Sequence, residues 1–146
     1  MMIERAALAS LVPHAGAMML LDGVEFWDGQ RIICISMQHR ANGNPLLTKT
    51  GLSSLNGIEF AAQAMAAHGA LTDNSSGRPR SGLLLSVRDC RLHVRRLDDL
   101  ASPLRIEAMQ LGRTAETRIY RFELSAREVK LVDGRLTVQL RQEEAP

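Results

Sequence analysis

The segment from Ser53 to Leu71 constrains the fold more than any other part of this sequence. It is rich in Ala, Met and Gln and has no Pro, and Ser53, Ser54 or Asn56 can cap its start, so it is predicted to be one helix of moderate length. Apolar residues cover almost the whole circumference of that helix, and a helix of this kind is buried. Its many small alanines would let the backbone of a sheet approach closely.

The segments on either side of this helix have the two-residue period of β-strands. Asp28–Gly29 predicts a turn between two strands, and a slip in the alternation at Arg88–Asp89 predicts a bulge in a long strand. Asp133–Gly134 fits a hairpin turn or a bulge within one strand; we favour the bulge, because a hairpin would leave two very short arms. The predicted strand regions are 20–38, 82–94, 104–112, 117–126 and 128–140. This order indicates an α+β domain in which a curved antiparallel sheet wraps one helix.

Length and composition limit the classes of protein to which this chain can belong. The 146 residues suffice for a single domain over 1–146, and 45% hydrophobic residues can form a core without disulfides or metal. The net charge of +2 is too small for a general nucleic-acid binder. No apolar run approaches the roughly 18 residues of a membrane span and no secretory signal is present, so we expect a cytoplasmic protein. Cys34 and Cys90 lack CxxC spacing, and no His or Cys pattern predicts a metal site.

Glu59 is the only carboxylate in the predicted helix. In a buried helix it either reaches a pocket or is desolvated, and desolvation raises the pKa of a carboxyl group towards values useful for acid–base chemistry. The alternative is that Glu59, near the helix start, only complements the helix dipole. Gln63 lies one turn further along the same face and could orient Glu59 by a hydrogen bond.

The four histidines differ in their surroundings. His14 follows a proline in an apolar segment, where it could line a pocket or serve as a structural hydrogen-bonding residue. His39 and His93 are expected to be solvated. His68, near the end of the apolar helix, is expected to interact with the helix dipole.

Arg91 and Arg95 are predicted to share one face of the strand that starts near Gly82. Two interpretations remain open for this basic surface. It is either a solvated sheet face with Asp98 and Asp99 as counter-ions, or a docking patch for an acidic carrier protein.

Two stretches taken together resemble a known family. LVPHAGAMMLLDGV, Leu11 to Val24, resembles the LPHR-P-x-x-LLD-x-V opening of FabZ-type 3-hydroxyacyl-acyl-carrier-protein dehydratases. GIEFAAQAMAAHGAL, Gly57 to Leu71, resembles their central helix with its E-x-x-AQ-x-x-A pattern. The ApeP-like group, associated with aryl polyene pigment biosynthesis, is more similar, because its helix reads much like GIE-x-x-AQA-x-AAH and an N-P element precedes it, as in GNPLL here. The resemblance covers most of the chain in order.

The resemblance implies a hot-dog fold, in which a long central helix is wrapped by an antiparallel sheet and two subunits pair so that their sheets continue into one. It also implies dehydration of 3-hydroxyacyl thioesters on acyl carrier protein to trans-2-enoyl thioesters, in fatty-acid-like or aryl polyene biosynthesis, without a cofactor. The active site would lie at the dimer interface, with Glu59 as the helix carboxylate.

The chain departs from the standard dehydratases in one respect. Their G-H-F-P-x-x-P loop carries a histidine before the helix carboxylate, whereas the matching stretch here, NPLLTKTGLSSLNGIE, has none. His14 is the best replacement, so we assign the base to His14 and the acid to Glu59, with Gln63 orienting the acid. Backbone amides from Ser54 to Gly57 are candidate donors to the thioester carbonyl, and Pro45 of the N-P element is a further candidate substrate-binding residue.

Two other functions remain open. The missing loop histidine would suit a non-catalytic or weakly active subunit that completes a heteromeric dehydratase with another hot-dog protein. A hot-dog acyl thioesterase is the second alternative, since thioester hydrolysis can also use a helix carboxylate. The sequence leaves undecided whether the partner subunit is a second copy of the chain or a different hot-dog protein, and which acyl chain is bound.

Overall fold

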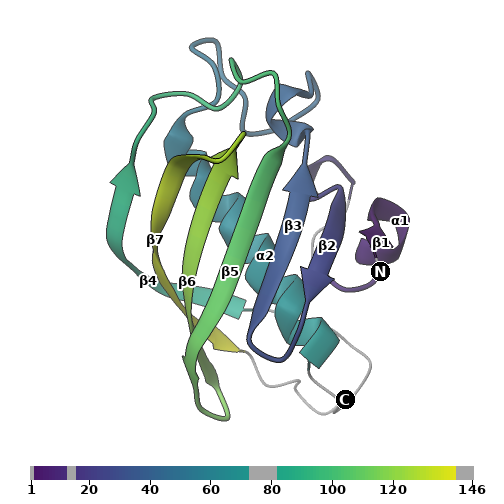
Figure 1. Ribbon diagram of the computed structural model, residues 1–146, viewed down its shortest axis with the longest axis vertical. Coiled ribbons are helices and arrows are strands. Elements are labelled where there is room, and N and C mark those ends of the chain that lie inside the picture. The colour runs from purple at the N-terminus through teal and green to yellow at the C-terminus, as the bar shows by residue number, and fades with distance from the viewer. Residues whose placement is uncertain (1, 13–15, 73–81, 141–146) are drawn as a thin grey trace.

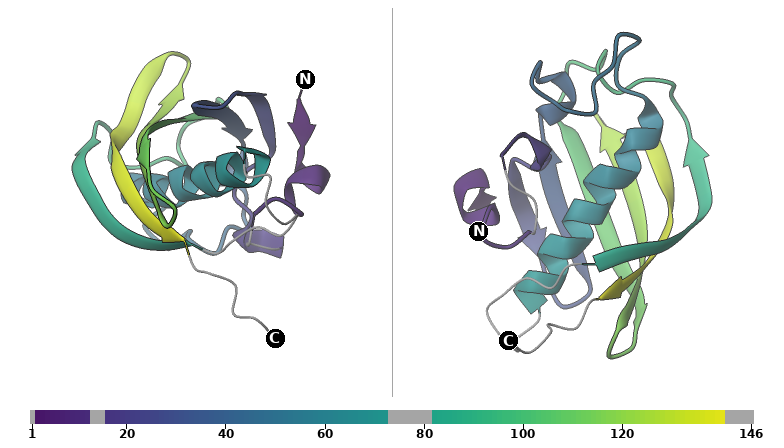
Figure 2. Two further views of the ribbon diagram at one scale, coloured as in Figure 1. Left: turned by 90° about the horizontal axis from the view of Figure 1, so that it is seen from below. Right: turned by 180° about the vertical axis from the view of Figure 1, so that it is seen from behind.

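The structure is a computed structural model, which describes residues 2–12, 16–72 and 82–140. A seven-stranded antiparallel sheet curves around one long helix, α2 (Figure 1). Across the sheet the strands follow the order β1-β2-β3-β5-β6-β7-β4. The elements are β1 Ile3–Glu4, α1 Arg5–Leu8, β2 Gly23–Trp27, β3 Arg31–Ser36, α2 Gly57–Thr72, β4 Gly82–Leu92, β5 Leu104–Arg113, β6 Thr117–Ala126 and β7 Val129–Leu140, with 3-10 turns at Gly16–Met18, Gln38–Arg40 and Ser54–Asn56. The predicted α+β class is confirmed, and α2 lies along the concave face of the sheet (Figure 2).

The central helix starts with a capped turn, as its sequence predicts. The Ser53 hydroxyl accepts a hydrogen bond from the Leu55 amide at 3.2 Å, one 3-10 turn follows, and α2 begins at Gly57. A Cβ atom on Gly57 would lie 3.1 Å from Leu124 Cδ2 and 3.2 Å from Val132 Cγ2. The absence of a side chain therefore lets the start of α2 pack directly on β6 and β7.

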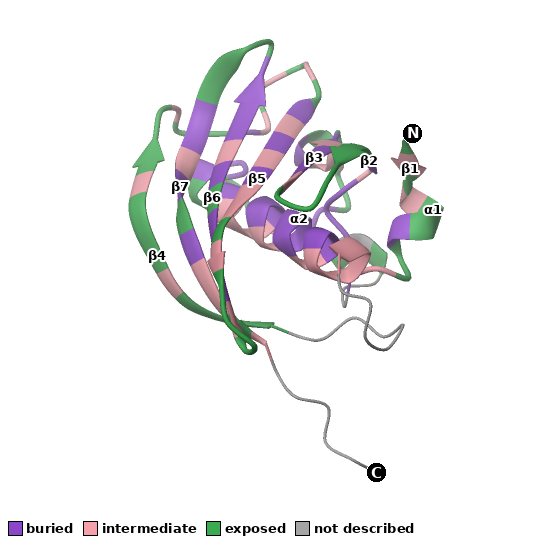
Figure 3. Ribbon diagram, turned by 60° about the horizontal axis from the view of Figure 1, so that its bottom comes forward, coloured by how far each residue is buried: buried purple, intermediate pink, exposed green. Residues whose placement is uncertain are grey.

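The core lies between α2 and the inner face of the sheet, where buried residues face each other (Figure 3). The small residues Ala61 and Ala64 face the strands from the helix and are fully buried. Larger side chains fill the inner face of the sheet; Ile106, Tyr120, Phe122, Leu124 and Leu136 are among them. Alternation along β5 and β6 places these residues on one face and polar residues on the other, as the period of the sequence predicts.

The bulge predicted in the long strand after the helix is present. Pairing between β4 and β7 shifts register between Arg88 and Arg91, and a second shift, between Leu84 and Ser86, was not predicted. The expected bulge at Asp133–Gly134 is wrong, because β7 is one regular strand there and the extra residue belongs to β4. On Gly134, a Cβ atom would lie 3.1 Å from the α-carbon at position 90 and 3.3 Å from the Arg88 carbonyl oxygen. Gly134 thus leaves room for the bulge of the neighbouring strand.

The predicted turn at Asp28–Gly29 joins β2 to β3. Asp28 Oδ1 accepts hydrogen bonds from the backbone amides of Gln30 and Arg31, both at 2.8 Å. These two bonds hold the pKa of the Asp28 carboxyl group below its ordinary value. The register of β2 and β3 is therefore fixed by the hydrogen bonds of the Asp28 side chain within the turn, as the Asp–Gly sequence predicts.

Candidate functional site

Glu59 lies in the first turn of α2 and is half-buried. Successive helical residues are rotated by about 100°, so Glu59 shares a side with Ala62 and Ala66 and lies opposite the buried Ala61 and Ala64. This side faces away from the sheet. Within the part of the chain that the structure describes, the Glu59 carboxylate forms neither a hydrogen bond nor an ion pair. It is thus the one carboxyl group of a largely apolar helix, available to a ligand.

Gln63 is fully buried and binds a different segment from the one expected. Its Oε1 accepts a hydrogen bond from the Leu20 amide at 2.8 Å, and its Nε2 donates to the Met18 carbonyl at 2.7 Å. No bond joins Gln63 to Glu59 among the described residues, so the expected orienting hydrogen bond is wrong. Both oxygen and nitrogen of the amide instead fasten the N-terminal segment to α2, one turn from Glu59.

His14 lies outside the described residues. The chain is described again from Gly16, and Gln63 holds the following residues, Met18 and Leu20, against the helix. The Ser36 hydroxyl adds a third contact to this segment by donating to the Leu20 carbonyl at 2.5 Å. Met18 and Leu20, which follow His14 in sequence, are therefore anchored close to the helix turn after Glu59.

The backbone amides expected to polarise a thioester carbonyl already have partners. The Ser54 amide donates to the Arg95 carbonyl at 3.0 Å, the Leu55 amide to the Ser53 hydroxyl, and the Gly57 amide to carbonyl oxygens of the preceding turn. The fourth, that of Asn56, donates to the Ser53 carbonyl at 3.0 Å. The assignment of these amides as free donors is therefore wrong, because the 3-10 turn and the loop beside it use them.

The loop before the helix is held by the residue next to Pro45. Asn44 is buried, its Nδ2 donates to the Gln38 carbonyl and its Oδ1 accepts from the Leu46 amide, both at 2.9 Å. Pro45 itself is exposed. In the N-P element, therefore, the asparagine stabilises the loop by its two hydrogen bonds.

The basic surface near the end of β4 differs from the expectation. Arg91 and Arg95 are both exposed, but β4 ends at Leu92, so the two do not share a strand face. Of the expected counter-ions, Asp98 pairs with Arg96, with 2.6 Å between Arg96 Nη2 and Asp98 Oδ2. Hydrogen bonding from Arg96 holds the pKa of Asp98 well below its ordinary value.

Two histidines are buried, and for His39 this overturns the expected solvent exposure. His39 is only 1% exposed and its Nε2 bonds the Leu100 carbonyl at 2.9 Å. His68 Nε2 bonds the Asp28 carbonyl at 2.8 Å, which requires a proton on Nε2, and its Nδ1 lies 2.5 Å from the Tyr120 hydroxyl. Burial lowers the pKa of both rings. His68 faces the sheet, on the side of α2 away from Glu59, whereas His93 is exposed as predicted.

Two parts of the surface are uncovered by described elements. Of the described strands only β7 pairs with β4, so no described strand lies along the other edge of β4, and Leu83 and Leu85 on β4 are 54% and 51% exposed. The side of α2 that carries Glu59 is likewise not covered by any described helix or strand (Figure 2, right). A long apolar edge is a template for pairing with another chain.

The described residues contain no group of three or more His, Cys, Asp or Glu side chains placed to hold a metal ion. None of the described helices is long and apolar enough to cross a membrane. What remains is a single carboxylate on an apolar helix, beside an anchored N-terminal segment and an uncovered face.

A long helix held in the concave face of a curved antiparallel sheet defines the hot-dog class of proteins. A family model described as ApeP-like, ApeP dehydratase, matches residues 6–145. The chain belongs to this family of dehydratases, and the class of enzyme that the family supports is a hydro-lyase.

Solved structures similar to this chain have the same fold. The dehydratase heterocomplex ApeI:P from Xenorhabdus doucetiae has 24% identity and a TM-score of 0.81, over 93% of this chain and 91% of the other. AziG from S. sahachiroi has 17% identity and a TM-score of 0.63, over 90% and 99% of the two chains. A mutant thioesterase from Staphylococcus aureus has 13% identity and a TM-score of 0.60, over 82% and 92%. No curated protein sequence matches the chain. At these identities the structural similarities establish the fold.

Proposed function

We propose that this protein dehydrates 3-hydroxyacyl thioesters carried on acyl carrier protein, giving trans-2-enoyl thioesters for aryl polyene or fatty-acid-like biosynthesis in the cytoplasm. The dehydratase family supports the class of reaction. The observation that carries the proposal is Glu59, the one carboxylate on an apolar helix, half-buried and without a partner among the described side chains.

The reaction needs a base and an acid. The base takes the proton from C2 of the acyl group, the double bond forms between C2 and C3, and the C3 hydroxyl leaves as water with a proton from the acid. We assign the base to His14 and the acid to Glu59. Only protons move between protein and substrate, so the step balances without an oxidant or reductant.

The role of Gln63 in this proposal follows from its two hydrogen bonds. By holding Met18 and Leu20 against α2, it fixes the segment next to His14 on the helix turn after Glu59. Geometry of this kind matters because a misplaced base loses much of its contribution to the rate. Gln63 is thus a positioning residue rather than a group that touches substrate.

A second hot-dog subunit is part of the proposal. We infer that it pairs with the free edge of β4 and covers the half-buried side of α2, which would enclose Glu59 at the interface. The similarity to a structure described as a heterocomplex, ApeI:P, supports a different hot-dog chain as that subunit, and a homodimer is the alternative. The exposed Arg91 and Arg95 are candidates for contact with an acidic carrier protein.

The test is an assay on a 3-hydroxyacyl carrier-protein thioester, followed by mass spectrometry for loss of water. The protein is assayed alone and with a candidate hot-dog partner, beside the variants Glu59→Gln, His14→Ala and Glu25→Gln. Glu25 is an exposed carboxylate on β2 and serves as the control. We expect Glu25→Gln to be fully active and the other two variants to lose about 10²–10⁴-fold in rate.

Three results would contradict this assignment. Full activity of Glu59→Gln in the complex would make the chain a non-catalytic subunit. Full activity of His14→Ala would remove the proposed base. Release of free acid instead of enoyl product by the unmodified protein would identify a thioesterase.

A further inference from the structure

A row of arginines crosses the outer face of the sheet, the side away from α2. Arg88 on β4 lies directly opposite Arg135 on β7, and Arg135 lies directly opposite Arg121 on β6. All three are exposed. Neighbouring strands are about 4.8 Å apart, so three guanidinium groups start within about 10 Å of one another. Like charges directly opposite each other destabilise a sheet.

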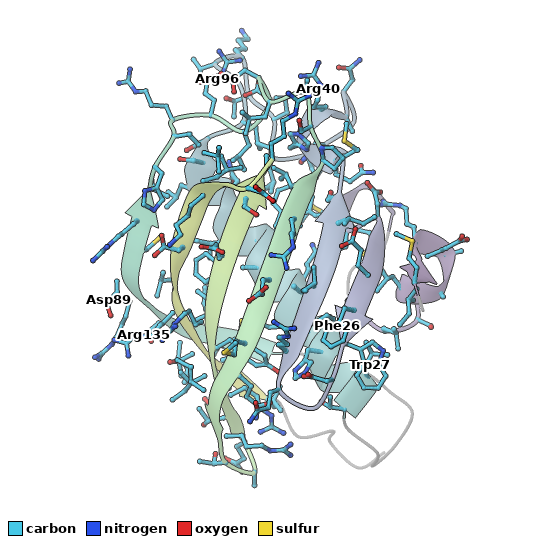
Figure 4. The ribbon with its side chains drawn as sticks, viewed as in Figure 1. Phe26, Trp27, Arg40, Asp89, Arg96 and Arg135 are labelled. Atoms are coloured by element: carbon cyan, nitrogen blue, oxygen red, sulfur yellow. The ribbon has the colours of Figure 1, made fainter. Side chains whose placement is uncertain are left out.

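The carboxylates nearby leave most of this charge uncompensated. Asp89 forms an ion pair with Arg135, reaching it from the β4 bulge (Figure 4). Arg88 and Arg121 have no ion pair with any described carboxylate. The next row of the same face carries three acidic residues, each with its own partner: Glu107 with Arg105, Glu123 with Lys130, and Asp133 with the His93 ring. The arginine row is therefore a local excess of positive charge beside a row of partnered carboxylates.

A hollow of about 410 Å³ lies beside this row, within the range of small-molecule sites. The strand register places a row of uncharged residues next to the arginine row, and this row lines the hollow. In it, Ser86 pairs with Thr137, and Thr137 pairs with Ile119. Two arginines, two hydroxyl-bearing residues and two aliphatic residues line the hollow. Its lining residues are Leu85, Ser86, Arg88, Ile119, Arg135 and Thr137.

We propose that this hollow binds a small anionic amphiphile, with a carboxylate or phosphate head and a short aliphatic tail. The head lies between Arg88 and Arg135, which can donate several hydrogen bonds to an oxyanion, and the tail lies on Leu85 and Ile119. The site is on the opposite face of the sheet from Glu59, so it is separate from the proposed dehydration site and does not depend on it.

A small ligand fits this face better than an acidic protein does. A protein surface laid over the arginine row would also cover the adjacent row with Glu107, Glu123 and Asp133, where the carboxylates already have partners and offer an acidic surface no further positive charge. A small molecule held in the hollow avoids that row. The hydroxyls of Ser86 and Thr137 add donors that suit an oxyanion at short range.

The test is a titration of ¹⁵N-labelled protein, in its native oligomeric form, with hexanoate, hexyl phosphate and the neutral hexanamide. We expect saturable shifts of amides at 86, 88, 135 and 137 with at least one anion and none with hexanamide; the anion that binds more tightly identifies the head group. Arg88→Gln and Arg135→Gln should each weaken binding about tenfold, because each removes a charge-assisted contact. Arg105→Gln, on the same face but outside the hollow, should leave it unchanged.

Several results would overturn this site. Equal affinity in Arg88→Gln and the unmodified protein would do so, and so would binding of hexanamide as tight as that of the anions. Shifts confined to α2 around Glu59 would place the anions in the dehydration site. An acidic carrier protein that shifts the four amides while neither anion does would make the arginine row a protein-docking surface.

Discussion

Replacing Gln63 by leucine removes two hydrogen bonds while keeping a side chain of similar size in place. The Leu20 amide, fully buried, would lose its acceptor, and the Met18 carbonyl, partly buried, would lose its donor. An unsatisfied buried group costs about 1–3 kcal/mol, so the two losses together should lower the free energy of unfolding by about 2–4 kcal/mol. That is a large share of the roughly 5–15 kcal/mol that stabilises an ordinary domain.

Urea unfolding followed by circular dichroism measures this change, and hydrogen exchange at the Leu20 amide localises it. Gln139→Leu, at an exposed position on β7, is the matched control and should stay within about 0.5 kcal/mol of the unmodified protein. In the dehydration assay Gln63→Leu should lower kcat although Glu59 is untouched, because the segment after His14 is released. Unchanged stability and unchanged protection of the Leu20 amide would refute the anchoring role.

Two further predictions concern buried titratable groups. Burial lowers the pKa of His68 from 6.5, so the unfolded chain takes up a proton at higher pH than the native one; the stabilisation by the neutral ring is complete above about pH 6.5 and declines as the pH falls below it. Thermal melts at pH 7.5 and 5 should therefore show a larger loss for the unmodified protein than for His68→Gln, and equal losses would contradict this. Burial raises the pKa of Cys34 to about 12, so iodoacetamide should modify this thiol only when urea unfolds the protein. Peptide mass spectrometry measures the modification, and an equally fast reaction of Cys34 in the native protein would contradict the prediction.

Several features of the fold were readable from local patterns. The apolar helix, the capped start at Ser53, the turn at Asp28 and the bulge after Arg88 each depend on residues close in sequence, and each is present. The nearly complete apolar surface of the helix predicted a buried helix, whereas the side that carries Glu59 is only half-buried in this chain.

The sequence by itself thus determined the long helix and the main strands, though not β1 and α1, and which residues stand out chemically on them. Only the tertiary structure decided what those residues touch. Gln63 bonds a segment more than forty positions away rather than Glu59, and His68 bonds Tyr120 and the Asp28 carbonyl on other elements rather than only complementing its own helix dipole. The reason is physical: periodicity gives the face of an element, whereas contacts between elements depend on strand order and register, which arise when distant segments pack together. The arginine row has the same origin, because Arg88, Arg121 and Arg135 are neighbours only across the strands of the folded sheet.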